Sequence, residues 1–482
     1  MQKSNGLSNK SASGFTRRDF VTTTLAVPAA AALVGTSFGV AQSQNGLPVR
    51  KEVSSLDAAE LQVFKDAVQI MRDRPASDPT SWEAAANFHI QFCTSLDVKQ
   101  QIHFGWWFLP WHRAYLHFTE KKLQAAVNEP SLAMPYWDWD ANPQLPPNYL
   151  GEGPSNNPLM GSGNPLADST RWATPDQILP KDLRNTTEPL RARTFGLFGG
   201  LPLIDLIVPS APGLMESPHN TVHYWAGGNM SDFATTARDP LFYALHANID
   251  RHWDIWVRLP SSDGNPTDPV WLERRFLLTD EKGLPVEIAI KDLLETEWVG
   301  YRYDNVKPPA SLASSVTGIG PEAAGAVTIE APGDGKPNVL ISEPLTKRLT
   351  ARAQAPIIKA LAAENPKVVV LQIERLEVPQ GLPTIYRFFL NRPDADAFTA
   401  PDRAAGYVGN LVLVPIAAEG PQPVMTARVM LPEGVLKDIA AHDENSITIV
   451  PVGIDVPPLG LKGPKGPEIK VGFWKLTLTV GE

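Results

Sequence analysis

The sequence predicts a mainly α-helical domain with irregular loops, followed by a small mixed appendage and a C-terminal β-sandwich domain. Before residue 260, apolar residues recur at helical spacing in several segments. After residue 366 they alternate or cluster in short runs bounded by Pro, Gly and Asn, which is typical of β-strands. A chain of 482 residues is also too long for one hydrophobic core, so we expect more than one structural unit.

The first half of the chain contains five segments with helical patterning. In the first of them Leu61, Phe64, Val68 and Met71 form a stripe that would pack one helix face against a core. Pro110 is compatible with the third segment because proline fits the first turn of a helix. The expected helices cover residues 56–71, 81–93, 109–127, 218–225 and 239–257, and together they predict one domain over 42–260.

The amino-acid composition and the pattern of apolar residues change after this domain. Residues 268–305 contain strand and helix pieces and are expected to form a small appended domain, and residues 306–365, rich in Pro, Ala, Gly and Ser, read as a linker. The remaining segment, 366–482, is expected to be the β-sandwich. Its expected strands lie at residues 368–371, 386–390, 411–414, 447–452 and 473–480.

Residues 1–41 read as a targeting signal rather than as folded structure. Arg17 and Arg18 precede an apolar, Ala-rich run that ends in small residues near Ala41. The run includes Thr, Pro and Gly and is too weakly apolar for a membrane span. This pattern predicts twin-arginine export, and hence a periplasmic or secreted bacterial protein with no membrane attachment after export.

The charge and cysteine content exclude several classes of partner and bond. The formal net charge is −9, and an acidic surface argues against nucleic acid or an anionic membrane as a partner. Cys93 is the only cysteine, so no intrachain disulfide can form. The sequence carries no signal for an oligomeric state.

The histidines are concentrated in one part of the chain. Eight of the nine lie between His89 and His252, and imidazole is the usual protein ligand for copper, zinc and iron. His219 and His223 are four residues apart, so on a helix both rings lie on one face and can bind one ion. Asn220 follows His219 where zinc metalloproteases carry a glutamate, which disfavours a hydrolytic zinc site.

Two longer blocks, residues 103–115 and 239–253, carry a more specific signal. They resemble the copper-binding motifs of tyrosinases and plant-type catechol oxidases, and residues 134–139 resemble a third block of the same family. The resemblance implies two copper ions with O2 as co-substrate, and a small phenol or catechol as substrate. It also implies that one copper is held by His89, His103 and His112 and the other by His219, His223 and His246.

The resemblance also implies roles for residues around the metals. Cys93 would form a thioether with His103, as a cysteine at this spacing does in plant-type relatives. Glu216 and Asn220 would orient a water molecule as the base that deprotonates a monophenol. Phe233 would stack on the aromatic substrate and restrict bulky ones.

Other residues near the motifs have less defined roles. Asp250, one helical turn after His246, is the best candidate to accept a hydrogen bond from that ring, with an ion pair to Arg113 or Arg251 as the alternative. Leu245 stands where relatives often have a second histidine, so altered local hydrogen bonding without loss of a ligand is expected. The histidines without a counterpart among the family's ligands are expected to be packing or surface residues: His117, His252 and His442.

The implied activity is the oxidation of o-diphenols to o-quinones, with ortho-hydroxylation of monophenols as in tyrosinases. The alternatives are a strict catechol oxidase, a haemocyanin-like oxygen-binding protein, and a zinc or iron hydrolase. The C-terminal domain resembles, more loosely, a domain that covers the active site in latent plant enzymes. Cover through the loop at residues 457–467 is therefore a hypothesis.

Overall fold

The computed structural model describes residues 46–481 except for 96, 98, 152–162, 204–210, 310–311, 313–326, 331–337, 341–343, 350–367, 378–383, 414–423, 433, 453–470 and 474. The expected signal at residues 1–41 and the 457–467 loop lie outside the described residues. Within them, no helix has both the length and the apolar character needed to span a membrane.

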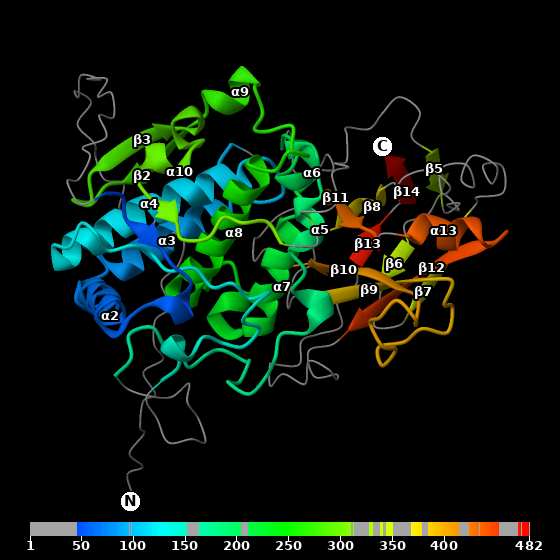
Figure 1. Ribbon diagram of the computed structural model, residues 1–482, viewed down its shortest axis with the longest axis horizontal. Coiled ribbons are helices and arrows are strands. Elements are labelled where there is room, and N and C mark those ends of the chain that lie inside the picture. The colour runs from blue at the N-terminus through cyan, green and yellow to red at the C-terminus, as the bar shows by residue number, and fades with distance from the viewer. Residues whose placement is uncertain are drawn as a thin grey trace, which may run out of the picture. The chain divides into compact units, whose positions relative to one another are not determined.

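The first domain is helical, as the sequence predicts. Helices α4 and α8 pack against each other at its centre (Figure 1). The long helices are α2 (Ala58–Asp73), α3 (Trp82–Cys93), α4 (Phe108–Val127), α7 (Glu216–Ala226) and α8 (Leu241–Val257). Shorter turns connect them: η1 (Val53–Ser55), η2 (Pro147–Tyr149), η3 (Lys181–Leu183), α5 (Thr187–Leu190), α6 (Phe195–Phe198), η4 (Gly228–Ser231) and η5 (Thr236–Arg238).

Local sequence explains where these helices begin and end. The Asp57 side chain caps α2 by accepting hydrogen bonds from the backbone amides of Ala59 and Glu60. The Glu60 side chain accepts one from the Asp57 amide, which completes a capping box. Helix α4 ends at Asn128, which adopts the left-handed conformation common after helices. Helix α7 ends at Gly227, whose φ of +71° and ψ of −170° suit only glycine.

The start of α8 is fixed by a buried ion pair. Arg171, from the loop-rich stretch, makes two bonds to the Asp239 carboxylate, at 2.8 and 2.6 Å. The same carboxylate accepts the amide of Leu241 at the first position of α8. Two-pronged arginine–carboxylate pairs are strong and directional, so the long loop is tied to the helix that carries His246.

The appended domain is connected to the helical core by a buried polar network. It comprises α9 (Pro269–Leu272), β2 (Arg275–Thr279), β3 (Pro285–Ala289), η6 (Ile290–Leu293), α10 (Thr296–Val299) and β4 (Arg302–Tyr303). β4 pairs in parallel with β1 (Val49–Arg50). Arg50 on β1 donates to Glu120 of α4 at 2.9 Å and to Asp250 of α8 at 3.4 Å, so one guanidinium joins three elements.

The C-terminal domain contains two four-stranded antiparallel sheets, ordered β10-β9-β12-β7 and β11-β8-β14-β5, which confirms the expected β-rich end. Figure 1 shows these strands in yellow to red. The strands of the domain are β5 (Val327–Glu330), β6 (Asn338–Leu340), β7 (Leu345–Leu349), β8 (Val368–Glu377), β9 (Thr384–Leu390), β10 (Tyr407–Leu413), β11 (Val424–Met430), β12 (Asn445–Val452), β13 (Val471–Phe473) and β14 (Lys475–Gly481), with one helix, α13 (Val435–Ala440).

The linker expected at residues 306–365 is wrong in part. Strands β5, β6 and β7 lie inside it and pair with β14, β13 and β12. These strands are only three to five residues long, too short for a pattern to stand out in a Pro- and Gly-rich context. They form strands because partner strands roughly 100 to 150 residues later complete their hydrogen bonding.

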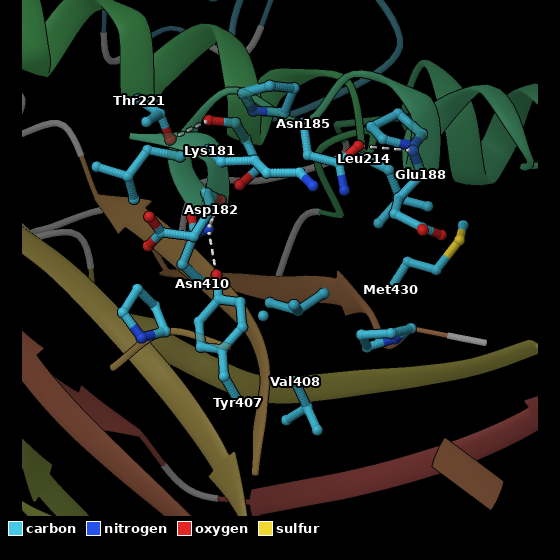
Figure 2. A pocket seen from close by; sticks show the side chains of 18 of the residues that line it. Lys181, Asp182, Asn185, Glu188, Leu214, Thr221, Tyr407, Val408, Asn410 and Met430 are labelled. Atoms are coloured by element: carbon cyan, nitrogen blue, oxygen red, sulfur yellow. Dashed lines mark hydrogen bonds between the residues drawn. The ribbon is translucent and has the colours of Figure 1, made fainter. Parts of the chain in front are cut away.

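Two arginines of the β domain reach the helical domain. Arg387 of β9 forms a buried ion pair with Asp182 of η3 at 3.1 Å. Arg428 of β11 donates to the carbonyls of Gly196, Ala211 and Pro212 at 2.7 to 3.2 Å. A cavity of about 400 Å³ lies along this domain interface. Figure 2 shows Thr221 on one side of it and Tyr407 and Val408 on the other.

Candidate dicopper centre

Six histidines from five parts of the helical domain (α3, the loop before α4, α4, α7 and α8) form two buried triads. His89 lies on α3, His103 in the loop before α4, and His112 on α4; in this triad the candidate ligand atoms lie within 4.8 Å of one another. His219 and His223 of α7 and His246 of α8 form the second triad by the same measure. The structure therefore brings together each set of three that the sequence predicts.

Helix geometry accounts for the arrangement. His219 and His223 are one turn apart on α7, and their ring centroids are 4.4 Å apart. The packing of α4 against α8 brings His112 onto His246, with ring centroids 4.2 Å apart and planes within 14°. The triads are thus adjacent, since this stacked pair contributes one ring to each.

Hydrogen bonds that the outer ring nitrogens (Nδ1) donate orient several of these histidines. Nδ1 of His112 lies 2.7 Å from the carbonyl oxygen of Phe108, and Nδ1 of His223 lies 2.9 Å from that of Met230. A carbonyl can only accept, so Nδ1 of each ring must carry the proton, and Nε2 of the neutral ring keeps its lone pair. Nδ1 of His219 lies 3.0 Å from Oδ1 of Asn220.

The inner nitrogens converge. Nε2 of His89 and His112 are 3.4 Å apart, and Nε2 of His246 lies 3.1 Å from that of His219 and 3.3 Å from that of His223. Burial lowers the pKa of every ring in the two triads, to about 3 for His112 and about 4 for His223. Neutral, inward-facing imidazoles are the donors that copper takes in proteins, so these residues fit two copper ions.

Asp250 does not contact His246, so the expected hydrogen bond between them is wrong. Its carboxylate accepts from Arg113 at 2.5 Å, from Arg50, and from the hydroxyls of Tyr301 and Tyr303. Burial would raise the pKa of Asp250, but Arg113 and Arg50 with the two tyrosines outweigh it and lower the pKa. The ion pair with Arg113, the alternative role, is the one present.

Cys93 and Phe233 lie beside the first triad. The Cys93 thiol is fully buried and lies 3.2 Å from the Phe233 carbonyl oxygen. The Phe233 ring stacks on His103, with centroids 4.6 Å apart and planes within 17°. Burial raises the pKa of the Cys93 thiol. The thioether to His103 stays a prediction.

Glu216 and Asn220 line one small cavity beside the triads, together with Phe104 and Phe233. Oε1 of Glu216 accepts the amide of Phe104 at 3.1 Å, while Oε2 is buried without a hydrogen-bond partner among the described residues. Burial raises the pKa of Glu216 to about 8, against the opposing effect of the Phe104 amide. The two residues thus face the same space, as their expected joint role requires.

Several residues around the metals could not be identified from the sequence. Phe104 adopts a left-handed φ of +66°, rare outside glycine, and so directs its amide to Glu216. Phe242 packs on His246 at 4.1 Å between centroids. Phe108 and Met230 contact the histidines through their backbone carbonyl oxygens. Every residue type has such an oxygen, so the sequence could not identify these two positions.

The three remaining histidines lie outside both triads. His117 is buried against Phe118, and His252 bonds to the Asn248 carbonyl and stacks on Trp139. His442, near the end of α13, bonds to the Asp438 carbonyl. Leu245 is fully buried, and Nδ1 of the adjacent His246 has no hydrogen-bond partner among the described residues.

Comparisons with known proteins agree with this arrangement. The common central domain of tyrosinase matches residues 79–195 and 208–259, and the polyphenol oxidase middle domain matches residues 265–316. The (+)-larreatricin hydroxylase of Larrea tridentata is 32% identical over 56% of this chain and 51% of its own length. A polyphenol oxidase of Malus domestica is 27% identical over 89% of this chain and 77% of its own.

A solved structure supports the same architecture. That of latent apple tyrosinase aligns with a TM-score of 0.66 and 25% identity over 90% of this chain and 97% of the apple chain. The match to the larreatricin hydroxylase spans only about half of that relative's length.

The comparisons contradict the expected periplasmic or secreted destination. The relatives from Larrea and Malus are both named as chloroplastic enzymes. The physical basis of the error is composition: Arg17 and Arg18 within a Ser- and Thr-rich segment that holds one acidic residue, Asp19, are also typical of organelle transit peptides. An arginine pair before an apolar run therefore does not define a bacterial export signal.

Two buried histidine triads, the matched central and middle domains and the shared architecture lead to one assignment: the chain belongs to the tyrosinase and polyphenol oxidase family of type 3 dicopper proteins.

Proposed function

We propose that this chain is a copper-dependent oxidase that uses O2 to oxidise o-diphenols to o-quinones and that also hydroxylates monophenols at the ortho position. The observation that carries the proposal is the pair of adjacent triads of buried, neutral imidazoles. Copper, when bound there, supplies the exchange of electrons between the phenol and O2. The Malus relative is named as a polyphenol oxidase.

The protein's own groups set up this chemistry. The carbonyls of Phe108 and Met230 hold His112 and His223 in the tautomer that leaves Nε2 free. Burial in an aromatic shell, including Phe242 against His246, excludes water and keeps the rings neutral. Phe233, stacked on His103, offers a flat apolar surface for a phenol ring.

Monophenol hydroxylation needs a base near the phenolic proton. Glu216 and Asn220 line the same cavity as Phe233, and Oε2 of Glu216 has no protein partner among the described residues. A water molecule held between this oxygen and Asn220 would take the proton. Because burial raises the pKa of Glu216 to about 8, the carboxylate form becomes available in mildly alkaline solution.

The test is oxygen uptake by the copper-loaded protein with a monophenol and with its matching catechol. Uptake with both supports the full proposal, and uptake with catechol alone reduces the activity to that of a catechol oxidase. The isosteric Glu216→Gln change should lower monophenol uptake by at least about tenfold with a much smaller effect on catechol. Equal losses on the two substrates would remove Glu216 from the proton transfer.

We also propose the thioether between Cys93 and His103. Formation joins sulfur to a ring carbon and removes one hydrogen from each, and O2 takes up these two electrons and two protons and leaves as hydrogen peroxide. The stack of Phe233 on His103 and the contact of the Cys93 thiol with the Phe233 carbonyl place all three residues together. The intact mass of copper-loaded protein should be lower by two hydrogen atoms, whereas Cys93→Ser should show the mass calculated from its sequence.

The β domain is proposed to cover the copper centre. Leu411 and Val412 of β10 and Met425 and Ala427 of β11 line the same small cavity as Glu216 and Asn220. Nδ2 of Asn220 also lies 3.5 Å from the Val412 carbonyl oxygen. Proteolytic removal of the domain should raise the rate of catechol oxidation, and an unchanged rate would rule the cover out.

A further inference from the structure

A third cavity, of 270 Å³, lies next to the first histidine triad, and no residue of the β domain is among its described lining residues. It is bounded by the end of α3, the residues before α4, and strand β2. Four aromatic side chains line it: Phe92, Trp107, Trp111 and Phe276. Its volume is at the lower end of the range of small-molecule sites, so it suits a ligand with one ring.

The charged groups that line this cavity are all positive. They are Lys99, Arg274 and Arg275, and no carboxylate is among the lining residues that the structure describes. The whole chain carries a net charge of −9, so a cavity with only cations departs from the charge of the molecule. Such a cavity attracts anions.

Arg274 is the polar group of this cavity that is best placed to bind an anion. Its guanidinium stacks on the rings of Trp107 and Phe276, with 5.4 and 5.9 Å to their centroids. One of its nitrogens donates to the Lys99 carbonyl, whereas its buried Nε has no hydrogen-bond partner among the described residues. No ion pair of Arg274 is present in the part of the chain that the structure describes, and the Asp97 carboxylate acts on it only at longer range.

Aromatic walls and an uncompensated guanidinium together select one class of molecule. A planar ring can stack among the tryptophan and phenylalanine side chains, and a carboxylate can accept charge-assisted hydrogen bonds from Arg274. A neutral ring would leave the cation unpaired, and an inorganic anion would leave the aromatic walls without a partner.

We propose that this cavity is a binding site for a small aromatic carboxylate, distinct from the copper centre. Trp111 lines the cavity and also packs on His89 and His112, with ring centroids 5.8 and 5.1 Å apart. A bound acid is therefore one side chain away from the first triad. Its occupancy does not compete for the space taken by a phenol at Phe233.

The test uses calorimetric titration of the copper-loaded full chain with 3-phenylpropanoate, which has no phenolic hydroxyl to oxidise. Saturable binding is expected for the acid, and binding at least about tenfold weaker for 3-phenylpropanamide, which keeps the ring and loses the charge. Equal binding of acid and amide would overturn the proposal, because the cations would then contribute nothing.

Variants locate the site. Arg274→Gln should weaken binding of the acid about tenfold. Leu277→Glu, at an exposed lining position on β2, adds a negative charge without disturbing the core and should also weaken binding several-fold. Arg302→Gln makes the same charge change as the first variant at an exposed residue of β4 and should leave affinity within about twofold. Wild-type affinity in both cavity variants would place the acid elsewhere and overturn the proposal.

Discussion

Replacing Asp250 with asparagine removes the negative charge at the centre of the network that connects the helical core to the appended domain. Arg113 lies 2.5 Å from this carboxylate, and within the described part of the chain it has no other ion pair. Arg50 retains Glu120 at 2.9 Å. Tyr301 and Tyr303 both direct their hydroxyls at Asp250. The change therefore removes the direct ion pair of the buried Arg113 and leaves Asp254 as its more distant counter-charge.

The size of the effect follows from burial. Asp250 and Arg113 have side chains only 2% and 1% exposed, and breaking a buried pair of this kind costs about 3–5 kcal/mol. Roughly 2 cal/mol/K of unfolding entropy per residue amounts to about 1 kcal/mol/K over the 482 residues, so this cost corresponds to a fall in the unfolding midpoint of roughly 3–5 °C.

Urea unfolding followed by tryptophan fluorescence measures this cost. The matched control is Asp263→Asn, the same change in an ion pair with Arg193 whose side chains are 49% and 42% exposed. Exposed pairs contribute at most about 1 kcal/mol. If the two variants lost equal stability, the network would not hold the domains together and the reasoning would be refuted.

Three further predictions concern the same regions. The pKa of Asp250 is lowered in the folded protein, so its stabilising effect is present above the unfolded-state pKa of roughly 4 and disappears as the pH falls through the folded-state pKa. The urea midpoints of wild type and Asp250→Asn should therefore converge in acid. A difference between the two midpoints that persists in acid would contradict this. Gly227→Ala should cost about 1–3 kcal/mol in backbone strain, and it should also displace Trp172, whose ring would lie 2.2 Å from the new Cβ. The thermal midpoint of this variant should therefore fall well below that of Gly264→Ala, where no atom lies within 4 Å of the new Cβ. Arg387→Met removes the buried ion pair with Asp182 and should loosen the domain interface. Protease cleavage between the domains and catechol oxidation should both be faster than in Arg348→Met, which breaks an exposed pair with Glu444. Identical behaviour of the two variants would exclude Arg387 as an interface contact.

Five of the six candidate metal ligands could be predicted from sequence because they lie inside local motifs, whereas His89 lies in none of these blocks and was assigned only from the family resemblance. His219 and His223 share a helix face by spacing alone, and the blocks around His112 and His246 carry enough neighbouring residues to identify the family. The helices that present them follow from periodicity, and α3 and α4 begin within one residue of the expected positions.

Contacts between distant segments could not be predicted. Asp250 is 200 residues from Arg50 and 53 from Tyr303, so a carboxylate near His246 in sequence was assigned to that ring although its partners come from elsewhere. The same limit explains β5, whose four residues become a strand only beside β14. It also explains Phe104, whose left-handed backbone serves a hydrogen bond to Glu216, 112 residues away.

Copper content per chain, measured by mass spectrometry on wild type and on single replacements in each triad, tests the central claim most directly. Wild type should bind two copper ions, one for each triad. His112→Ala and His246→Ala should each lose at least one ion together with oxygen uptake on catechol. A wild-type protein that oxidises catechol with fewer than two coppers, or turnover that survives either replacement, would contradict the account.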